Sequence, residues 1–350
     1  MSNLERTHQL KLDPWAASSL LQKAIRRGEA ELAKHAARTF YRQRGNAIWR
    51  RLVTIAFEDV GIGDLKLLSD LTYLATDKNL RAMVGADIDV ILDLCQRLAD
   101  APKDRGTDYL FCAATKLDAG LRERALLTSL AHSDRMAIAA DPAQPLIRRA
   151  VATLLSHSAN GEGTQLVRGE NIPQFLASFR NDWPASLHEA VNVAAQKTGH
   201  PFTLMLPILW SAMACGETDP AITTDLVPRL EFLDGIPLYT FDKHTRVGKQ
   251  AIRLFALENA ELRNVLADYV PEPVAPDVAL MAAFYADAMP ITRRLEWSQS
   301  RSLEQLGREA DMVGAGCPVE GITAILACVR ENLGHLNQLR RDFIVGRAKT

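Results

Sequence analysis

The chain has 350 residues, of which 47% are hydrophobic and 24% are charged. This is the composition of an ordinary globular protein, so it excludes a disordered chain, a collagen-like repeat and a disulfide scaffold. The 41 Lys and Arg residues are balanced by 42 Asp and Glu residues, and the net charge of −1 excludes a uniformly basic nucleic-acid coat. The length predicts two domains or one large helical domain.

Five cysteines are spread along the chain without any Cys-x-x-Cys pair: Cys95, Cys112, Cys215, Cys317 and Cys328. Structural zinc sites use close pairs of ligands, so this spacing predicts no metal site. Free thiols fit a reducing compartment, and the first residues lack the apolar core of a signal peptide. We therefore expect a cytoplasmic protein with no metal, no other cofactor and no membrane-spanning segment.

Apolar residues recur at helical spacing along nearly the whole chain, whereas the alternation typical of strands is scarce. The pattern predicts an all-α, multi-helical fold. In chain order, the predicted helices cover residues 14–27, 29–44, 46–60, 64–77, 87–100, 107–118, 120–132, 144–157, 170–180, 185–198, 203–215, 222–233, 247–269, 276–289, 291–312 and 318–342. The polar run 158–164 and the proline-rich run 270–276 are predicted loops.

Positive charge is concentrated near the start of the chain, where residues 11–51 hold ten Lys and Arg residues but only three acidic ones. Lys34, Arg38 and Arg42 recur every four residues, so they share one face of the second predicted helix. Such a face can contact phosphates without reading the base sequence. A protein-binding surface and a solvated helix face are the alternatives. We predict sequence-nonspecific DNA binding through this face and its flanks: Arg26, Arg27, Lys34, Arg38, Arg42 and Arg44.

The sequence lacks the common motifs of nucleotide-binding and hydrolytic enzymes. Its only Gly-Lys pair, Gly248-Lys249, has no glycine five residues before it and is therefore not a phosphate-binding loop of the P-loop type. No G-x-G-x-x-G, G-x-S-x-G or H-E-x-x-H segment occurs either. We therefore assign no catalytic residue and expect a protein that is not an enzyme.

Several spaced motifs in the first third of the chain occur in the order of a known module. Residues 18–28 are SSLLQKAIRRG, residues 36–38 are AAR, and residues 49–64 are WRRLVTIAFEDVGIGD. Further on, LADAPK covers 98–103 and FCAA covers 111–114. Over residues 15–118 or so, the chain resembles the helical C-terminal collar of the RarA/MgsA family of replication-recombination AAA+ ATPases.

The resemblance implies a collar-like helical domain at residues 1–118, followed by a helical domain of unrecognised family at 119–350. Collars of this family hold clamp-loader-like ATPases in rings or tetramers, in proteins that act at stalled replication forks and DNA ends. By resemblance, we expect a replication- or repair-associated protein that forms homo-oligomers or joins a RarA-type ATPase or another replication protein. Only about fourteen residues precede the collar-like region, so we expect no ATPase module and no ATPase activity.

Two carboxylates close the third predicted helix. Glu58 and Asp59 lie at its C-terminal end, where the helix dipole disfavours anions by about 0.3–1 kcal/mol each. They are therefore expected to have cationic partners, for which Arg27, or Arg26 beside it, is the candidate. The hypothesis is a structural clasp of Arg27, Glu58 and Asp59 that joins the first helix to the third. Solvated carboxylates are the alternative.

The segment 234–249 is the densest cluster of chemistry-bearing residues outside the collar-like region. Asp242, His244, Arg246 and Lys249 lie within eight residues of one another. An Asp can fix the tautomer of a neighbouring His, and Arg with Lys can hold an anion, as in a nuclease or phosphoesterase. This anion-binding or catalytic loop is the alternative function. The favoured interpretation is a loop in which Asp242 or Thr245 caps the next helix.

Overall fold

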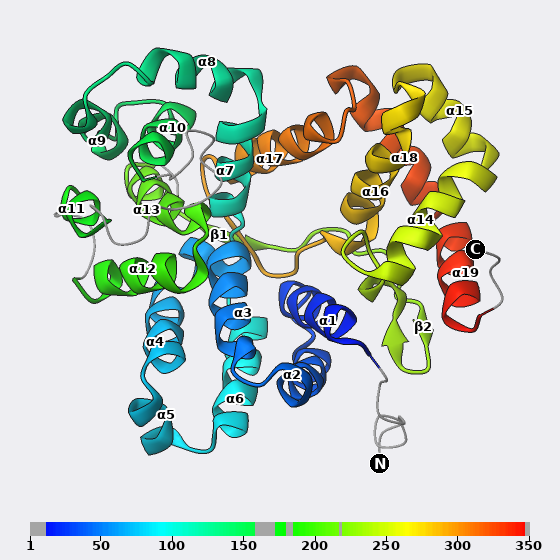
Figure 1. Ribbon diagram of the computed structural model, residues 1–350, viewed down its shortest axis with the longest axis horizontal. Coiled ribbons are helices and arrows are strands. Elements are labelled where there is room, and N and C mark those ends of the chain that lie inside the picture. The colour runs from blue at the N-terminus through cyan, green and yellow to red at the C-terminus, as the bar shows by residue number, and fades with distance from the viewer. Residues whose placement is uncertain (1–11, 158–171, 180–184, 217–218, 347–350) are drawn as a thin grey trace. The chain divides into compact units, whose positions relative to one another are not determined.

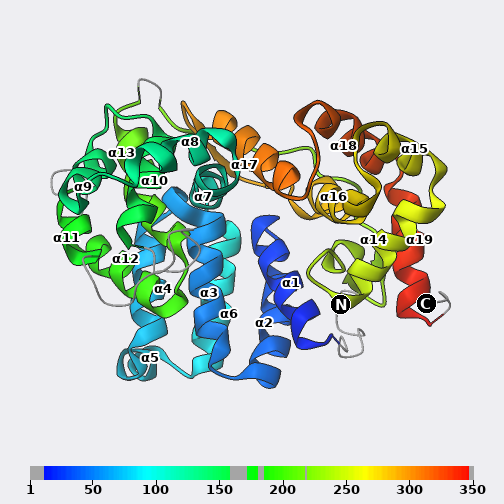
Figure 2. The same ribbon diagram turned by 45° about the horizontal axis from the view of Figure 1, so that its top comes forward.

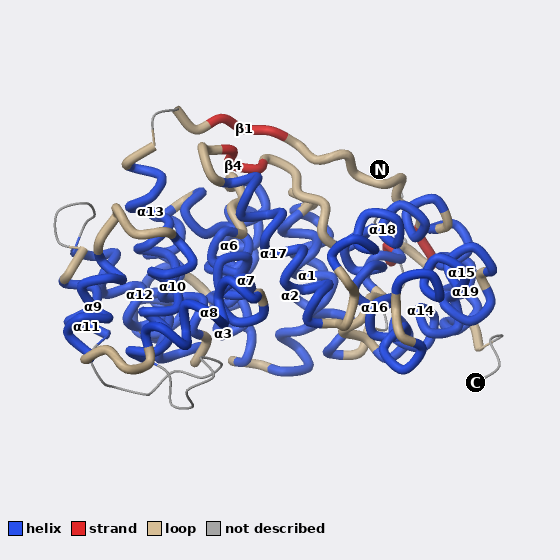
Figure 3. Tube along the Cα trace, turned by 90° about the horizontal axis from the view of Figure 1, so that it is seen from above, coloured by secondary structure: helices blue, strands red, loops and turns tan. Residues whose placement is uncertain are grey.

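The computed structural model describes residues 12–157, 172–179, 185–216 and 219–346. Over these residues the chain is helical almost throughout and has only four short strands (Figures 1 and 3). The predicted all-α, multi-helical fold is therefore confirmed. The predicted loop at 158–164 lies outside the described residues.

The described residues form two compact units, each assembled from separate stretches of the chain. The first unit holds residues 12–45, 225–291 and 311–346, and the second holds residues 46–224 and 292–310 as far as they are described. This division differs from the predicted boundary at residue 118. Helices α7 (Gly106–Lys116) and α8 (Asp118–Leu127) flank that position, belong to the same unit and pack against each other.

The first unit begins with a helical hairpin of α1 (Pro14–Arg26) and α2 (Ala30–Arg44), which lie side by side (Figure 2). Asp13 caps α1 and Pro14 occupies its first turn, where a missing N–H costs nothing. The chain reverses at Gly28, whose φ of +70° favours glycine.

The rest of the first unit comes from the second half of the chain. It contains the strands β2 (Phe232–Leu233) and β3 (Ile236–Pro237) and a short 3-10 turn, Leu238–Thr240, that packs against α1. Helix α14 packs against α16 and α19, and α18 packs against α15 and α16 (Figure 1). Their bounds are α14 (Arg246–Glu258), α15 (Ala260–Tyr269), α16 (Ala275–Ala283), α18 (Ile322–Glu331) and α19 (Leu333–Ile344).

The second unit is built from helices in nearly continuous order. Helix α4 packs against α3, α6 and α12, and α10 packs against α7, α8, α9 and α13. Their bounds are α3 (Ala47–Ile55), α4 (Leu65–Thr76), α5 (Lys78–Val84), α6 (Asp87–Asp100), α9 (His132–Ala140), α10 (Leu146–His157), α11 (Ile172–Ala177), α12 (Ala185–Thr198) and α13 (Leu206–Ala214). Strands β1 (Ala221–Thr223) and β4 (Arg294–Glu296) pair antiparallel, with Ile222 opposite Leu295. Helix α17 (Ser300–Gly314) starts in this unit, and its residues from 311 on belong to the first.

The predicted helix at 222–233 is wrong. Its ends form β1 and β2, and β2 turns into β3 through Asp234 and Gly235, whose φ values are +49° and +78°. An Asp-Gly pair with two positive φ values is the preferred two-residue hairpin turn, so this local signal outweighs the apolar spacing before it. The predicted helix at 291–312 is also wrong at its start, which contains β4.

Two further differences concern helix ends, and a third concerns helices that the sequence did not predict. The predicted helix at 247–269 breaks at Asn259, whose backbone is extended and whose side chain caps α15 by accepting from the Leu262 N–H at 2.8 Å. The predicted loop at 270–276 is shorter than expected, because Glu272–Val274 forms a 3-10 turn and Pro276 lies in the first turn of α16. Helices α5 and α9 were not predicted.

Each unit has a core of buried apolar side chains that also contains fully buried cations. Phe255 and the inward stripe of α1 (Leu20, Leu21 and Ile25) belong to the first unit, and Trp49 and Phe57 belong to the second. Among the largest side chains with less than 2% exposure are also Arg26, Lys103, Arg149 and Arg340. Buried charges are costly unless they are paired, so each buried cation is expected to have polar partners, and these partners form the buried polar clusters of the two units.

Candidate functional site

The outer surface of α2 carries the exposed part of the basic cluster. Arg38, Arg42 and Arg44 are exposed, and none of them has an ion pair or hydrogen bond among the described residues. Lys34, one turn before Arg38, is half-buried and lies 2.8 Å from Glu31. We call Lys34, Arg38, Arg42 and Arg44 the α2 basic face. The structure thus brings four of the six predicted DNA-binding residues onto one helix.

The positive charges of this helix also lower the pKa of a neighbouring histidine. The pKa of His35 is lowered by partial burial and, in addition, by the charges of Arg38 and Arg42. A positive potential disfavours the protonated imidazole and favours an anion by the same physics. The α2 basic face is therefore suited to hold phosphate oxygens at its surface.

Arg26 and Arg27 are buried and do not belong to this surface, so their predicted DNA contact stays a prediction that their positions do not support. They are only 1% and 5% exposed. The Arg26 guanidinium donates to the Ala288 carbonyl at 2.8 Å, and that of Arg27 donates to the Asp287 carbonyl. No local signal in the sequence marks their burial, because the carbonyl groups that they bind lie about 260 positions further along the chain.

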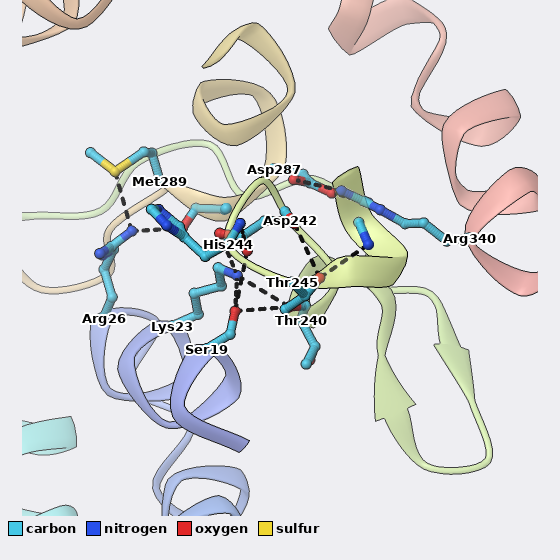
Figure 4. A network of polar contacts seen from close by, with 12 residues as sticks. Ser19, Lys23, Arg26, Thr240, Asp242, His244, Thr245, Asp287, Met289 and Arg340 are labelled. Carbon is cyan, nitrogen blue, oxygen red and sulfur yellow. Dashed lines mark hydrogen bonds and ion pairs between the residues drawn. The ribbon is translucent and has the colours of Figure 1, made fainter. Parts of the chain in front are cut away.

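A buried polar network joins α1 to residues 240–242 (Figure 4). The sequence did not predict that these residues meet. The Lys23 ammonium is 2.9 Å from the Asp242 carboxylate, and it also donates to Ser19 Oγ. Ser19 Oγ in turn donates to the Thr240 carbonyl at 2.8 Å. Lys23 lies three residues after Leu20 on the apolar stripe of α1, and a lysine at such a position signals a buried carboxylate partner.

The four candidate residues of the loop before α14 do not point into one common site, as the residues of an active site would. Asp242 is fully buried, and besides binding Lys23 it accepts the His244 N–H at 2.9 Å. Thr245 caps α14, with its Oγ1 accepting the Gly248 N–H at 3.0 Å. The structure thus supports the predicted capping role of this loop.

The other three candidates of that loop, His244, Arg246 and Lys249, are exposed. The His244 ring meets Phe284 edge-on, with ring centroids 5.7 Å apart. Arg246 and Lys249 lie in the first turn of α14. Because Asp242 faces inward to Lys23 while these three are exposed, the nuclease or phosphoesterase alternative gains no support from their arrangement.

In the second unit, Glu58 and Asp59 meet Arg105, a residue that sequence reasoning missed. One guanidinium nitrogen lies 3.0 Å from Glu58 and in contact with Asp59, and the other contacts Asp108. Arg105 directly precedes α7, where the helix dipole disfavours a cation, so its position indicates carboxylate partners. The predicted Arg27–Glu58–Asp59 clasp would join residues of different units and stays a prediction.

Next to Arg105, the chain buries two more ionisable groups. Lys103 donates to the Ala99 carbonyl at 2.9 Å, and burial lowers its pKa to about 7. Asp104 accepts from Trp297 Nε1 and from the Gly106 N–H, both at 2.9 Å, and burial raises its pKa. These contacts fix the segment between α6 and α7, which holds the last three residues of the LADAPK motif and then Asp104 and Arg105.

Within the described parts of the chain, no group of three or more His, Cys, Asp and Glu residues is arranged to hold a metal ion. The five cysteines are free thiols, four of them buried. Again among described residues, no single helix has both the length and the apolar character to cross a membrane; only the bent pair Ser300–Gly314 and Val319–Glu331 meets both when taken together.

We compared the chain with known proteins. It matches no family model, no curated protein and no solved structure. The side chains and the resemblance of residues 15–118 are therefore the features from which a function can be inferred.

Proposed function

We propose that this protein is a non-catalytic component of DNA replication or repair that contacts DNA phosphates through the α2 basic face and assembles through its collar-like region. The observation that carries the proposal is the exposure of Arg38, Arg42 and Arg44 without any acidic partner among the described residues. Phosphate contacts of this kind are independent of base sequence and weaken with salt, because each one releases condensed counterions.

The exposed cations of this face are mainly arginines, which bind phosphate better than lysines do. Arg38 and Arg42 are one turn apart, roughly 6 Å along the helix axis. A guanidinium offers a planar set of donors that matches phosphate oxygens better than the point charge of an ammonium. The Arg38 and Arg42 guanidinium groups, on consecutive turns of one face, can therefore follow one backbone strand. Arg44 follows Arg42 by two residues and extends from another side of the helix end, and Lys34 is partly neutralised by Glu31.

The test is a titration of fluorescently labelled duplex DNA with the full chain, read by anisotropy. We expect the triple variant Arg38→Gln, Arg42→Gln, Arg44→Gln to lose most of the affinity at low salt. The matched control is Arg246→Gln, Lys249→Gln, Arg253→Gln, which removes the same charge from exposed positions of α14. No binding by the wild type, or an equal loss in both variants, would refute the DNA contact.

Assembly is the second part of the proposal and rests on the resemblance to RarA/MgsA collars. Light scattering of the purified chain should give a mass that is a multiple of 38.6 kDa. Addition of a RarA-type ATPase should shift the mass again if the two proteins share a ring. A protein that is monomeric and does not bind this ATPase would refute the proposed assembly, while the proposed DNA contact would still depend on the DNA titration alone.

A further inference from the structure

The first unit contains a cavity of about 220 Å³ behind the end of α1. Three arginines from distant parts of the chain line it: Arg27 at the end of α1, Arg229 in the segment before β2, and Arg330 in α18. Tyr239 and Asp287 complete the wall around Arg27. The site therefore combines three cations within a space smaller than the usual pocket for a drug-sized ligand.

Arg27 is the buried part of this site. Its guanidinium stacks over the Tyr239 ring at 4.4 Å from the centroid and donates from Nη2 to the Asp287 carbonyl. Its Nε and Nη1 are buried and have no hydrogen-bond partner among the described residues. Buried donors are nearly always paired, so two guanidinium nitrogens with three unused N–H groups beside a cavity indicate a missing acceptor. Burial also lowers the pKa of Arg27, although Tyr239, Glu29 and Asp287 act in the opposite direction.

The carboxylates near the cavity are already engaged. Asp287 binds Arg340, and Glu231 binds both Arg341 and Asn337. Glu29 accepts a hydrogen bond from the Tyr239 hydroxyl. Arg229 and Arg330, in contrast, are exposed and make no ion pair or hydrogen bond with a described residue. The cations of the cavity therefore exceed the anions that could neutralise them.

A hollow in the second unit provides a useful contrast. It measures about 470 Å³, and its polar lining includes Asp70 and Arg97, which bind each other at 2.7 Å. Its other walls include Leu74, Leu80 and Val84. That hollow is lined by one cation, Arg97, and three carboxylates, Asp70, Asp89 and Asp93, so it has no comparable excess of cations.

We propose that the cavity at Arg27 binds a phosphate group, held by the buried Arg27 guanidinium and closed by Arg229 and Arg330. A phosphate offers enough acceptor oxygens for several guanidinium groups at once, and its charge balances more than one of them. The volume admits a free phosphate ion or the terminal phosphate of a larger molecule whose remainder stays outside. The site is separate from the α2 basic face and independent of the proposed DNA contact.

The test is thermal melting of the full chain in increasing inorganic phosphate, with sodium chloride used to match the ionic strength. A parallel arm uses a 5′-phosphorylated trinucleotide and its unphosphorylated counterpart. We expect a saturable rise of Tm with at least one of the two phosphate probes and none with the unphosphorylated trinucleotide. A response to inorganic phosphate identifies a site for the free ion, and a response to the trinucleotide alone identifies a site for a terminal phosphate.

The variant Arg229→Gln, Arg330→Gln changes only exposed side chains, so it should fold and should need about tenfold more of the phosphate probe for the same rise. Arg27→Met should abolish the rise. The matched control Arg246→Gln, Lys249→Gln should respond like the wild type, as should the α2 triple variant. Identical melting in phosphate and chloride for both probes, or an unchanged response of the Arg229→Gln, Arg330→Gln variant, would overturn the proposal.

Discussion

The Lys23 ammonium lies 2.9 Å from the Asp242 carboxylate, and the two side chains are only 3% and 1% exposed. This ion pair connects α1 to the loop before α14 within the first unit. Burial lowers the pKa of Lys23 to about 8, while the charge of Lys23 lowers the pKa of Asp242 against the opposing effect of burial. Each charge is therefore tolerated in the interior because the other is present.

A double-mutant cycle on this pair should show strong coupling. Lys23→Met leaves a buried carboxylate without its cation and should lower the free energy of unfolding by about 3–5 kcal/mol. Asp242→Asn keeps an acceptor for the His244 N–H but strands the ammonium. Because the double variant removes both charges, it should be more stable than Lys23→Met alone, as measured by urea denaturation. Additive losses would show that the two charges do not depend on each other.

Arg105 should be the most sensitive cation of the second unit. Burial alone would lower its pKa, but Asp59, Asp108 and Glu58 raise it well above the ordinary value. Arg105→Met should cost about 3–5 kcal/mol of unfolding free energy, because Asp59 is completely buried. Arg105→Lys should recover only part of this, since one ammonium cannot replace a planar group that spans three carboxylates.

The control for Arg105 is Arg301→Gln. Arg301 binds Glu296 at 2.8 Å in the same unit, but its side chain is 49% exposed, so the loss should stay within about 1 kcal/mol. Both variants can be compared by denaturant unfolding under one condition. Equal losses at the two positions would contradict the stabilising role assigned to the buried cluster.

Gly248 should not tolerate a side chain. A Cβ at this position would lie 2.0 Å from the Asp242 carbonyl oxygen, which is backbone and cannot move aside cheaply. We expect Gly248→Ala to destabilise the protein by about 1–3 kcal/mol, measured as a lower Tm, while the exposed Gly334→Ala should not. An unchanged Tm for Gly248→Ala would show that the loop and α14 can separate without cost.

Stability should increase with pH because of Lys103. Burial lowers its pKa to about 7, so between pH 7 and 10.5 the folded state holds Lys103 neutral while the unfolded chain still binds the proton. The unfolded state then binds more protons, and unfolding free energy rises by roughly 2 kcal/mol from pH 7 to pH 9. Lys103→Met should lack this increment in urea titrations at the two pH values. The smaller increment from Lys23 is present in both proteins, so equal pH dependences would refute the assignment.

Much of the fold follows from local signals that are strong in this sequence. Asp13-Pro14 and Gly28 delimit α1, and the spacing of Leu20, Leu21 and Ile25 identifies its buried stripe. The helix predicted at 222–233 failed because apolar spacing does not register a two-residue turn at Asp234-Gly235. The long helix predicted at 247–269 failed because Asn259 prefers to cap a new helix.

The candidate sites were harder to predict, because they depend on contacts across long sequence separations. Periodicity placed Arg38 and Arg42 correctly on one face of α2. It could not distinguish them from Arg26 and Arg27, which are buried and donate hydrogen bonds to carbonyl groups more than 250 positions away. In the same way, nothing local links Asp242 to Lys23, and nothing local assembles Arg27, Arg229 and Arg330 around one cavity.

The most direct test of the central claim is the salt dependence of DNA affinity for the wild type and for the Arg38→Gln, Arg42→Gln, Arg44→Gln variant. Each phosphate contact contributes a slope of about −0.9 to the plot of log K against log salt concentration. If three guanidinium groups of α2 contact phosphates, the variant should have a slope that is shallower by roughly 2–3. Parallel lines for the two proteins would contradict the account, because they would mean that α2 contacts no phosphate.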